Sequence, residues 1–393
     1  MLNHLAHSTR SLVDFVSDDD EEYNSLLREG TALLQNVTSG MNAVIGGHAR
    51  TKKNGFVFYY DIGYGSTKKI AQTYHGEKAI SIPFEKDYLP QLQTIKSSFN
   101  RDENDWNERT AEIYIHALDE TVHTIIKDRG RAEVHDSLLI LDHITSNTAI
   151  HTPINAITKY AKEEYDMLVA VDGAHSLLSL PLDMSTILSP SCGSNGYVDI
   201  YLTNCHKWLS SPRGVAALFC TNEEIRDTLL SQPAVVSHGV NDGFLSRFLW
   251  DGCRDYSAAL SLPVICDYWN TANVDIVRET IQTNLKEGVR ILVSHWHGED
   301  ESNNLDDFTL VPLEMHAPGM ALVRLPDDIS GISSKERKTS TDAKRLQDYL
   351  YDNHIEVPIK CVNGILYARV SCHVYNEVSE FEKLAEVALE YKQ

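Results

Sequence analysis

The sequence lacks the features of a secreted or membrane-inserted protein. No apolar run is long enough to span a membrane, and no charged segment followed by an apolar one marks a signal peptide at the amino terminus. The seven cysteines are odd in number and include no Cys-x-x-Cys pair, which is typical of reduced thiols rather than of a disulfide framework. Internal repeats and low-complexity segments are also missing. We therefore expect a cytoplasmic protein.

Positive charge is scarce as well. The 393 residues include 35 Lys and Arg against 56 Asp and Glu, a formal net charge of −21. This balance argues against nucleic acid or an anionic membrane as a partner. With 42% hydrophobic and 23% charged residues, the composition is ordinary for a globular chain with a sizeable core.

Short apolar runs alternate with helix-like stretches from residue 10 to residue 270. The runs are about five residues long and nearly continuous in hydrophobicity, which is typical of strands covered on both faces. They occupy residues 55–60, 137–141, 167–171, 198–202 and 215–219, with helical periodicity at 111–127 and 153–164 between them. The alternation predicts an α/β three-layer large domain with a mainly parallel sheet over residues 1–270.

The pattern changes in the last third of the chain. Residues 271–296 predict a long linking helix. The elements expected after it are strands at 320–324 and 366–371 and helices at 342–352 and 377–391. This order predicts a smaller α+β domain over residues 271–393.

Two strand ends carry residues that suit one cofactor. Asp172 follows one predicted strand, and Lys207 follows the next, 35 positions later. Ligands of α/β sheets gather at the carboxyl ends of strands. A lysine amine forms a Schiff base with an aldehyde, and a carboxylate keeps a pyridine nitrogen protonated, as pyridoxal 5'-phosphate requires. Alone, such an Asp is most often a turn or cap and such a Lys a solvated charge, but the pair favours a cofactor site.

Other residues could complete this site. Thr38 and Ser39 precede a helical run, where hydroxyls and backbone N–H groups suit a phosphate, with a simple N-cap as the alternative. His175, on the turn after the aspartate, could stack on or hydrogen bond a ring. Tyr64 follows a strand and could stack flat on a ring or be an ordinary aromatic. Arg369, inside an apolar strand, suits either a bidentate clamp on a substrate carboxylate or a salt bridge.

Six stretches together resemble fold-type I pyridoxal-phosphate enzymes of the class V aminotransferase family, and its isopenicillin N epimerase-like branch in particular. In the family's order they are NVTSGMNAV (36–44), DHITS (142–146), VDGAH (171–175), NCHKWL (204–209), FLWDGCRDYS (248–257) and ARVSCHVYN (368–376). The resemblance covers nearly the whole chain. It implies homodimers with active sites at the subunit interface, a small amino-acid substrate and no metal.

The resemblance also implies a role for each matching residue. Lys207 would form the Schiff base, Asp172 would pair with the pyridinium, and His175 would lie near the ring's phenolic oxygen. Tyr64 would stack on the ring where relatives often use His, and Arg369 would bind the substrate's α-carboxylate. The residues implied for the phosphate are Thr38, Ser39 and His206 with Asn204 nearby, and those implied for the phenolic oxygen are Ser146 or Asn147.

The sequence departs from the family pattern in two places. Cys253 stands where relatives usually have a Thr that reaches the neighbouring subunit's phosphate, so we expect weaker phosphate binding. Relatives also carry an early Leu-Asn-His-Gly-Ser-like motif that helps to close the active site. Residues 2–4 match only its first part. We therefore expect either that the sequence is truncated at its amino terminus or that the active site is incomplete.

The resemblance implies reaction through an external aldimine and a quinonoid. The favoured activity is that of a Cβ–S lyase, similar to fungal-type hercynylcysteine sulfoxide lyases of ergothioneine biosynthesis, with pyruvate and ammonia as products. An amino-acid epimerase, an aminotransferase and a degenerate non-catalytic homologue are the alternatives. A cysteine desulfurase needs a cysteine on a mobile loop. Cys361 lies only eight residues before Arg369, too close for such a loop.

Overall fold

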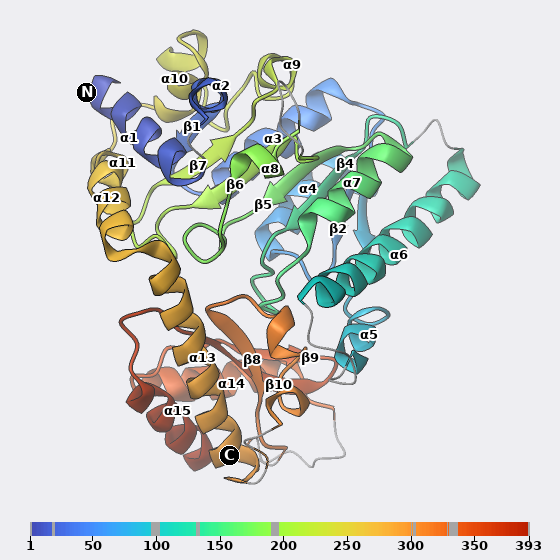
Figure 1. Cartoon of the computed structure of the whole chain (residues 1–393). Helices are drawn as coiled ribbons and strands as arrows, with labels where there is room; N and C mark the ends of the chain where they lie inside the picture. Colours follow the sequence, from blue (N-terminus) through green and yellow to red (C-terminus); the bar gives the residue numbers. More distant parts are fainter. Residues whose placement is uncertain are drawn as a thin grey trace. The chain divides into compact units, whose positions relative to one another are not determined.

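The computed structural model describes residues 2–17, 20–95, 103–130, 134–189, 196–299, 301, 304–327, 329 and 337–391. These residues form two compact units (Figure 1). The first comprises Met1–Pro83, Ala111–Ile144 and Thr152–Val274, and the second Phe84–Thr110, Thr145–His151 and Asp275–Gln393. The sequence-based division at residue 270 does not include the two early segments of the second unit.

A seven-stranded sheet forms the centre of the first unit in the described residues. Its order is β1-β7-β6-β5-β4-β2-β3, and β3, β2, β4, β5 and β6 run parallel while β7 is antiparallel to both neighbours. The strands are β1 (Thr31–Leu34), β2 (Val57–Tyr60), β3 (Ala79–Ile82), β4 (Leu138–Asp142), β5 (Leu168–Asp172), β6 (Ile200–Asn204) and β7 (Ala216–Phe219). The predicted mixed α/β fold with a mainly parallel sheet is confirmed.

Helices cover the sheet because its strands are apolar on both faces. Every residue of β2, β4 and β6 is buried. Val57, Leu138 and Ile200 share one hydrophobic cluster with Met41 and Ile70 of the covering helices. The helices of this unit are α1 (Leu2–Phe15), α2 (Glu21–Glu29), α3 (Val37–Thr51), α4 (Gly65–His75), most of α6 (Glu103–Arg129), α7 (Ile154–Tyr165), α8 (Met184–Ile187), α9 (Glu223–Asp227), α10 (Phe244–Leu249), α11 (Ser257–Leu260) and α12 (Leu262–Ala272), with 3-10 turns η1 (Gly76–Lys78) and η3 (His238–Asn241).

Helix α3 lies unusually close to the sheet. A Cβ atom on Gly40 would come within 2.2 Å of the Leu202 side chain, and one on Gly47 within 2.0 Å of the Leu229 carbonyl oxygen. No side chain larger than hydrogen fits at either position without movement of the neighbouring atoms. The start of α3 is therefore held next to the carboxyl end of β6.

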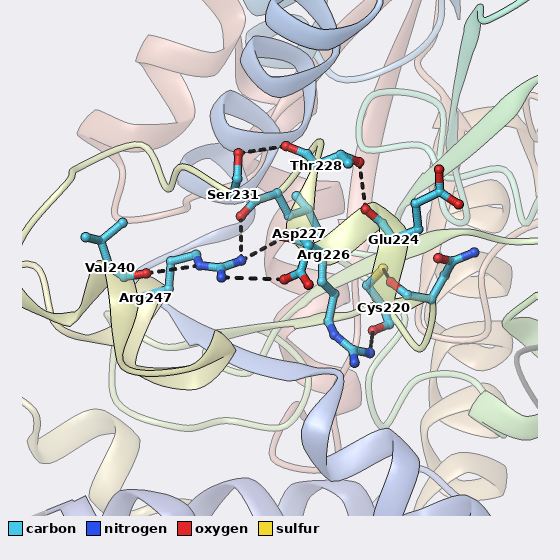
Figure 2. A network of polar contacts seen from close by, with 10 residues as sticks. Cys220, Glu224, Arg226, Asp227, Thr228, Ser231, Val240 and Arg247 are labelled. Carbon is cyan, nitrogen blue, oxygen red and sulfur yellow. Dashed lines mark hydrogen bonds and ion pairs between the residues drawn. The ribbon is translucent and has the colours of Figure 1, made fainter.

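Two arginines, the buried Arg226 and the partly buried Arg247, fix the segment that leads into α10 (Figure 2). Arg247 donates to the carbonyl oxygens of Arg226 (2.8 Å) and Leu230 (3.3 Å). Arg226 in turn donates to those of Cys220 (3.0 Å) and Thr221 (2.8 Å). Because charge-assisted bonds to carbonyl groups are strong, this network sets the position of α10 against the chain between Cys220 and Leu230.

The second unit contains an antiparallel three-stranded sheet of order β8-β10-β9. Its elements are β8 (Met320–Arg324), β9 (Ile359–Val362), β10 (Ile365–Ser371), α5 (Leu89–Thr94), α13 (Val274–His297), α14 (Ser340–Asp352), α15 (Val378–Glu390), η5 (Leu305–Asp307) and η6 (Leu313–Met315). The expected helix from residue 271 begins instead at Val274, because Asn273 has a φ of 61° and separates it from α12. None of the described helices is long and apolar enough to cross a membrane.

Candidate active site

Three neighbouring parallel strands end in polar side chains at one edge of the first unit's sheet. Asp142 ends β4 and is the register partner of Asp172, which ends β5. Asn204 ends β6, the next strand, and His206 and Lys207 follow it directly. The parallel order therefore brings together the strand ends that the sequence predicted, as expected for a ligand site in an α/β sheet.

Lys207 contacts the turn that follows β5. Its Nζ atom lies 2.8 Å from Nε2 of His175, and the Lys207 side chain is only partly exposed. The backbone after it is tightly turned, since the N–H of Ser210 donates to the Lys207 carbonyl oxygen (3.1 Å). The Trp269 indole N–H donates to the carbonyl oxygen of Leu209 (2.8 Å), so α12 anchors the same turn. The lysine amine is thereby held near the strand ends.

Asp172 is buried and hydrogen bonded. The backbone N–H of Ala174 donates to its carboxylate (3.1 Å), and so does the Thr67 hydroxyl (3.4 Å). Burial raises the pKa of Asp172, while these two donors and the charge of Lys207 oppose the rise. The sequence did not single out Thr67. Its only signal is that it lies three residues after Tyr64, in the first turn of α4.

The first turn of α3 forms a set of backbone donors. Asn36 is the N-cap and accepts the N–H of Ser39 (2.9 Å), and the side chain of Asn204 accepts the N–H of Val37 (3.1 Å). The prediction put Thr38 and Ser39 before the helix. That placement is wrong, since both lie inside its first turn and Asn36 caps it. The Ser39 hydroxyl donates to the Asn36 carbonyl oxygen (2.7 Å).

An open pocket of about 770 Å³ joins this helix start to Lys207. Its lining residues are Gln35, Asn36, His206, Lys207, Arg213, Gly214, Arg254, Asp255 and Ala258. The His206 Nδ1 bonds to the Val215 carbonyl oxygen (3.0 Å). Burial lowers the pKa of His206, and the charges of Lys207 and Arg213 lower it further. Donors at a helix start together with nearby cationic side chains suit an anionic group such as a phosphate.

One wall of the pocket is braced by residues that the sequence did not predict. Gln35 donates to Asp251 (2.6 Å), which pairs with Arg254 (2.6 Å). The Arg254 guanidinium lies 4.8 Å from the centre of the Tyr256 ring. Cys253, in the same segment, is exposed. The family resemblance at 248–257 includes Asp251, Arg254 and Tyr256 but gave them no role, because the contact with Gln35 joins segments more than 200 positions apart.

Comparison with known proteins finds a family model that matches part of this arrangement. Residues 107–238 match the family model described as aminotransferase class-V. The stretch contains both strand-end aspartates, His175 and Lys207. This part of the chain is therefore similar to class V aminotransferase domains. Thr38, Ser39 and Tyr64 lie before the matched stretch.

Several curated proteins are similar to this chain at low identity. The L-cysteine desulfhydrase of Arabidopsis thaliana is 28% identical over 283 residues, which are 67% of this chain and 56% of that protein. The isopenicillin N epimerase of Amycolatopsis lactamdurans is 27% identical over 273 residues, 64% of this chain and 59% of that protein. The chain spans about half the length of the curated relatives it matches.

A solved structure shares the fold of this chain. The cystine C-S lyase C-DES, in complex with its reaction product cysteine persulfide, has a TM-score of 0.64 and 17% identity. The match covers 100% of this chain and 87% of that one. At this identity the likeness establishes the fold alone.

The remaining predicted site residues divide between the two units. Tyr64 caps α4, is 40% exposed, and donates its N–H to Asp142 (3.0 Å). In the second unit, Nη1 of Arg369 donates to the carbonyl oxygen of Ser146, and Asn147 follows in the same turn. The Arg369 Nε is buried and has no hydrogen-bond partner among the described residues. That N–H can still bind an oxygen ligand such as a carboxylate.

Proposed function

We propose that this chain is a pyridoxal-phosphate-dependent Cβ–S lyase that acts on cysteine or a cysteine-derived amino acid. The observation that carries the proposal is the Lys207 amine, held 2.8 Å from His175 beside the buried Asp172. Pyridoxal 5'-phosphate supplies an aldehyde for an amine and a protonated ring that accepts electrons from Cα of an amino acid. The residues around the pocket suit each part of that cofactor.

The phosphate would lie at the start of α3. Thr38 and Ser39 occupy the first turn of this helix, and His206 lines the adjoining pocket. Asn204 orients the turn through the Val37 N–H and so acts on the phosphate site indirectly. Helix starts favour anions through their unpaired N–H groups and the helix dipole.

Asp172 would hold the pyridine nitrogen in its charged form. Two donors and the charge of Lys207 favour its ionised state against the effect of burial. Lys207 Nζ would remove the proton from the substrate's Cα, and Nε2 of His175 could accept a proton from Lys207 across their hydrogen bond. Tyr64 would cover the ring, and Ser146 or Asn147 would approach the phenolic oxygen.

Arg369 would bind the α-carboxylate of the substrate. Its guanidinium is mostly buried, and one face is fixed by Ser146. The buried Nε–H supports this role because a carboxylate accepts two parallel N–H bonds from one arginine.

The relatives favour a sulfur leaving group. Loss of the Cα proton followed by cleavage of the Cβ–S bond releases the sulfur fragment, and hydrolysis of the remaining enamine gives pyruvate and ammonia. The similarity to a protein named L-cysteine desulfhydrase supports this course. Within this class, hercynylcysteine sulfoxide, a substrate of ergothioneine biosynthesis, is the specific candidate that the sequence resemblance suggests.

Cys361 does not suit the desulfurase alternative. It lies in β9, which pairs with β10, and burial raises the pKa of its thiol. A nucleophilic thiolate needs a low pKa and an accessible position. Epimerisation is the second candidate, because the chain is similar to an isopenicillin N epimerase; transamination by the same residues would instead give an oxo acid that keeps its sulfur.

Absorbance and product analysis test the proposal. The purified protein with pyridoxal 5'-phosphate should absorb at the edge of the visible range, and Lys207→Ala should abolish this band while Lys286→Ala, on α13, should not. Incubation with cysteine, cystine and cysteine sulfoxides should release pyruvate. A protein that stays colourless with added cofactor contradicts the whole proposal. A yellow protein that yields no pyruvate from any sulfur substrate contradicts only the lyase assignment. We further propose that the protein is cytoplasmic and forms a homodimer. Light scattering of the loaded protein would detect the dimer.

A further inference from the structure

Two aspartates meet at the edge of the sheet where Lys207 lies. Asp142 and Asp172 are register partners on the adjacent parallel strands β4 and β5. Side chains at paired positions point to the same face, on strands about 4.8 Å apart. Both residues are buried, with 8% and 3% of their surface exposed. Two negative charges at this distance, away from water, repel each other strongly.

The hydrogen bonds of the two carboxyl groups differ. Asp172 accepts from the Ala174 N–H and from the Thr67 hydroxyl. Asp142 accepts from the Tyr64 N–H at 3.0 Å. Since each donor stabilises a negative charge, the single charge that the pair can hold is better stabilised on Asp172.

The surrounding cations favour the ionised form of both aspartates, but burial and the charge of Asp172 outweigh them at Asp142. Lys207, after β6, acts on both aspartates, and Lys68 on α4 acts on Asp142. The Lys68 ammonium donates to the backbone oxygen of Asp61, which occupies part of its hydrogen-bonding capacity. Burial, followed by the charge of Asp172, raises the pKa of Asp142 well above its usual range.

Asp142 also fixes the turn that carries Tyr64. A Cβ atom on Gly63 would lie 3.3 Å from Oδ1 of Asp142 and 3.0 Å from the Tyr60 carbonyl oxygen. The turn therefore packs closely on the carboxyl group. Removing that group would free the start of α4, which bears both Tyr64 and Thr67.

We propose that Asp142 is a positioning residue that holds a proton, orients Tyr64 through its backbone N–H, and leaves Asp172 as the single negative charge of the pair. The use of this charge by a pyridine nitrogen rests on the proposed function. The division of one proton between two carboxyl groups is a property of the protein alone. It can therefore be tested without cofactor.

The test compares the full chain with its Asp142→Asn variant. Asparagine is neutral and keeps an oxygen acceptor for the Tyr64 N–H, so it mimics the protonated acid. In the unfolded chain an aspartate ionises with a pKa of about 3.9. Unfolding of the wild type therefore releases a proton that the variant does not carry. The unfolding equilibrium constant of the wild type should therefore rise relative to that of Asp142→Asn as pH increases from 5 to 7. The expected rise is about tenfold per pH unit, as long as Asp142 stays protonated.

Asp348→Asn serves as the matched control. Asp348 is paired with Lys344 on the exposed face of α14, so this variant makes the same substitution at an exposed aspartate without touching the buried pair. The ratio of the wild-type unfolding equilibrium constant to that of Asp348→Asn should vary much less over the same pH range. The proposal is overturned if the ratio of the unfolding equilibrium constants of the wild type and Asp142→Asn is independent of pH or falls as pH rises.

Two further measurements keep the proposal testable. Infrared spectra at neutral pH should show the carbonyl band of a buried carboxylic acid in the wild type and lose it in Asp142→Asn. If that variant does not fold, absence of the band in the wild type overturns the proposal. With pyridoxal 5'-phosphate added, Asp142→Asn should bind the cofactor within about threefold of the wild type, while Asp172→Asn should bind it about tenfold more weakly or worse. Failure of both wild type and variants to bind it would contradict the proposed function and leave the proton test intact.

Discussion

The Nζ atom of Lys207 lies 2.8 Å from Nε2 of His175, although the two residues are 32 positions apart. The contact orients the amine at the edge of the sheet and gives it a neighbour that can exchange a proton. It links the turns that follow β5 and β6.

Replacing His175 tests this relationship. His175→Ala removes the acceptor, so the rate of pyruvate release should fall by about 10²-fold with a small change in KM. His175→Gln keeps an oxygen acceptor and should restore part of the rate. Steady-state kinetics, together with the pH dependence of the cofactor's absorbance, measure both. An alanine variant with wild-type kcat and an unchanged absorbance profile would show that the contact has no role in proton transfer.

The N-cap of α3 should affect phosphate binding as well as stability. Asn36→Ala leaves the Ser39 N–H without its side-chain acceptor, so the free energy of unfolding should fall by about 1 kcal/mol. Cofactor affinity should also fall, by up to about tenfold. Asn222→Ala is the matched control, because Asn222 caps α9 by accepting the Ile225 N–H (3.2 Å). Equal effects of the two variants on cofactor affinity, measured by fluorescence titration, would argue against a phosphate at α3.

Arg369 should contribute to substrate binding through its planar guanidinium group. Arg369→Lys keeps the charge but loses the bidentate geometry, so KM should rise by about tenfold or more while the cofactor's absorbance is retained. Arg324→Lys, on β8 of the same unit, pairs with Asp327 and should leave KM unchanged. An unaltered KM in Arg369→Lys would remove the arginine from the substrate site.

The arginine network of Figure 2 should contribute to stability. Arg247→Ala leaves the carbonyl groups of Arg226 and Leu230 without a donor, so the free energy of unfolding should fall by about 2 kcal/mol. Arg290→Ala breaks a half-exposed ion pair with Glu287. This variant should change the free energy of unfolding by less than about 0.5 kcal/mol. Urea unfolding measures both, and similar values for the two variants would contradict the assignment.

Buried histidines should make the protein sensitive to acid. Burial lowers the pKa of His48 to about 4, and those of His151 and His316 likewise. The unfolded chain, with histidine pKa values of about 6.5, binds more protons, so this contribution to stability is complete above pH 6.5 and is lost as pH falls toward 4. In His48→Gln the free energy of unfolding should decrease less steeply as pH falls, by up to about 1.4 kcal/mol per pH unit. The surface variant His354→Gln should leave this slope unchanged. Identical slopes would exclude His48 as a contributor.

Sequence patterns predicted the central strands because those runs are apolar and buried on both faces. Strands β2, β4, β5, β6 and β7 lie where they were expected. The edge strands β1, β3 and β9 were missed. Each is defined by a single pairing partner, and β3 and β9 are only partly buried, so their apolar pattern is weak. The break between α12 and α13 at Asn273 was also missed. A single residue in the left-handed conformation leaves the hydrophobic periodicity of the flanking helices nearly continuous.

The sequence alone indicated the mainly parallel α/β fold and the place of Asp172 and Lys207 at neighbouring strand ends. Local hydrophobic periodicity marks strand ends, and parallel strands bring those ends to one edge. Only the tertiary structure revealed that Thr67 bonds Asp172, 105 positions away, and that Asn204 bonds the Val37 N–H, 167 positions away. It also brought Asp142 beside Asp172. Strand register and helix packing decide these contacts, and both arise from the whole core rather than from any local stretch of residues.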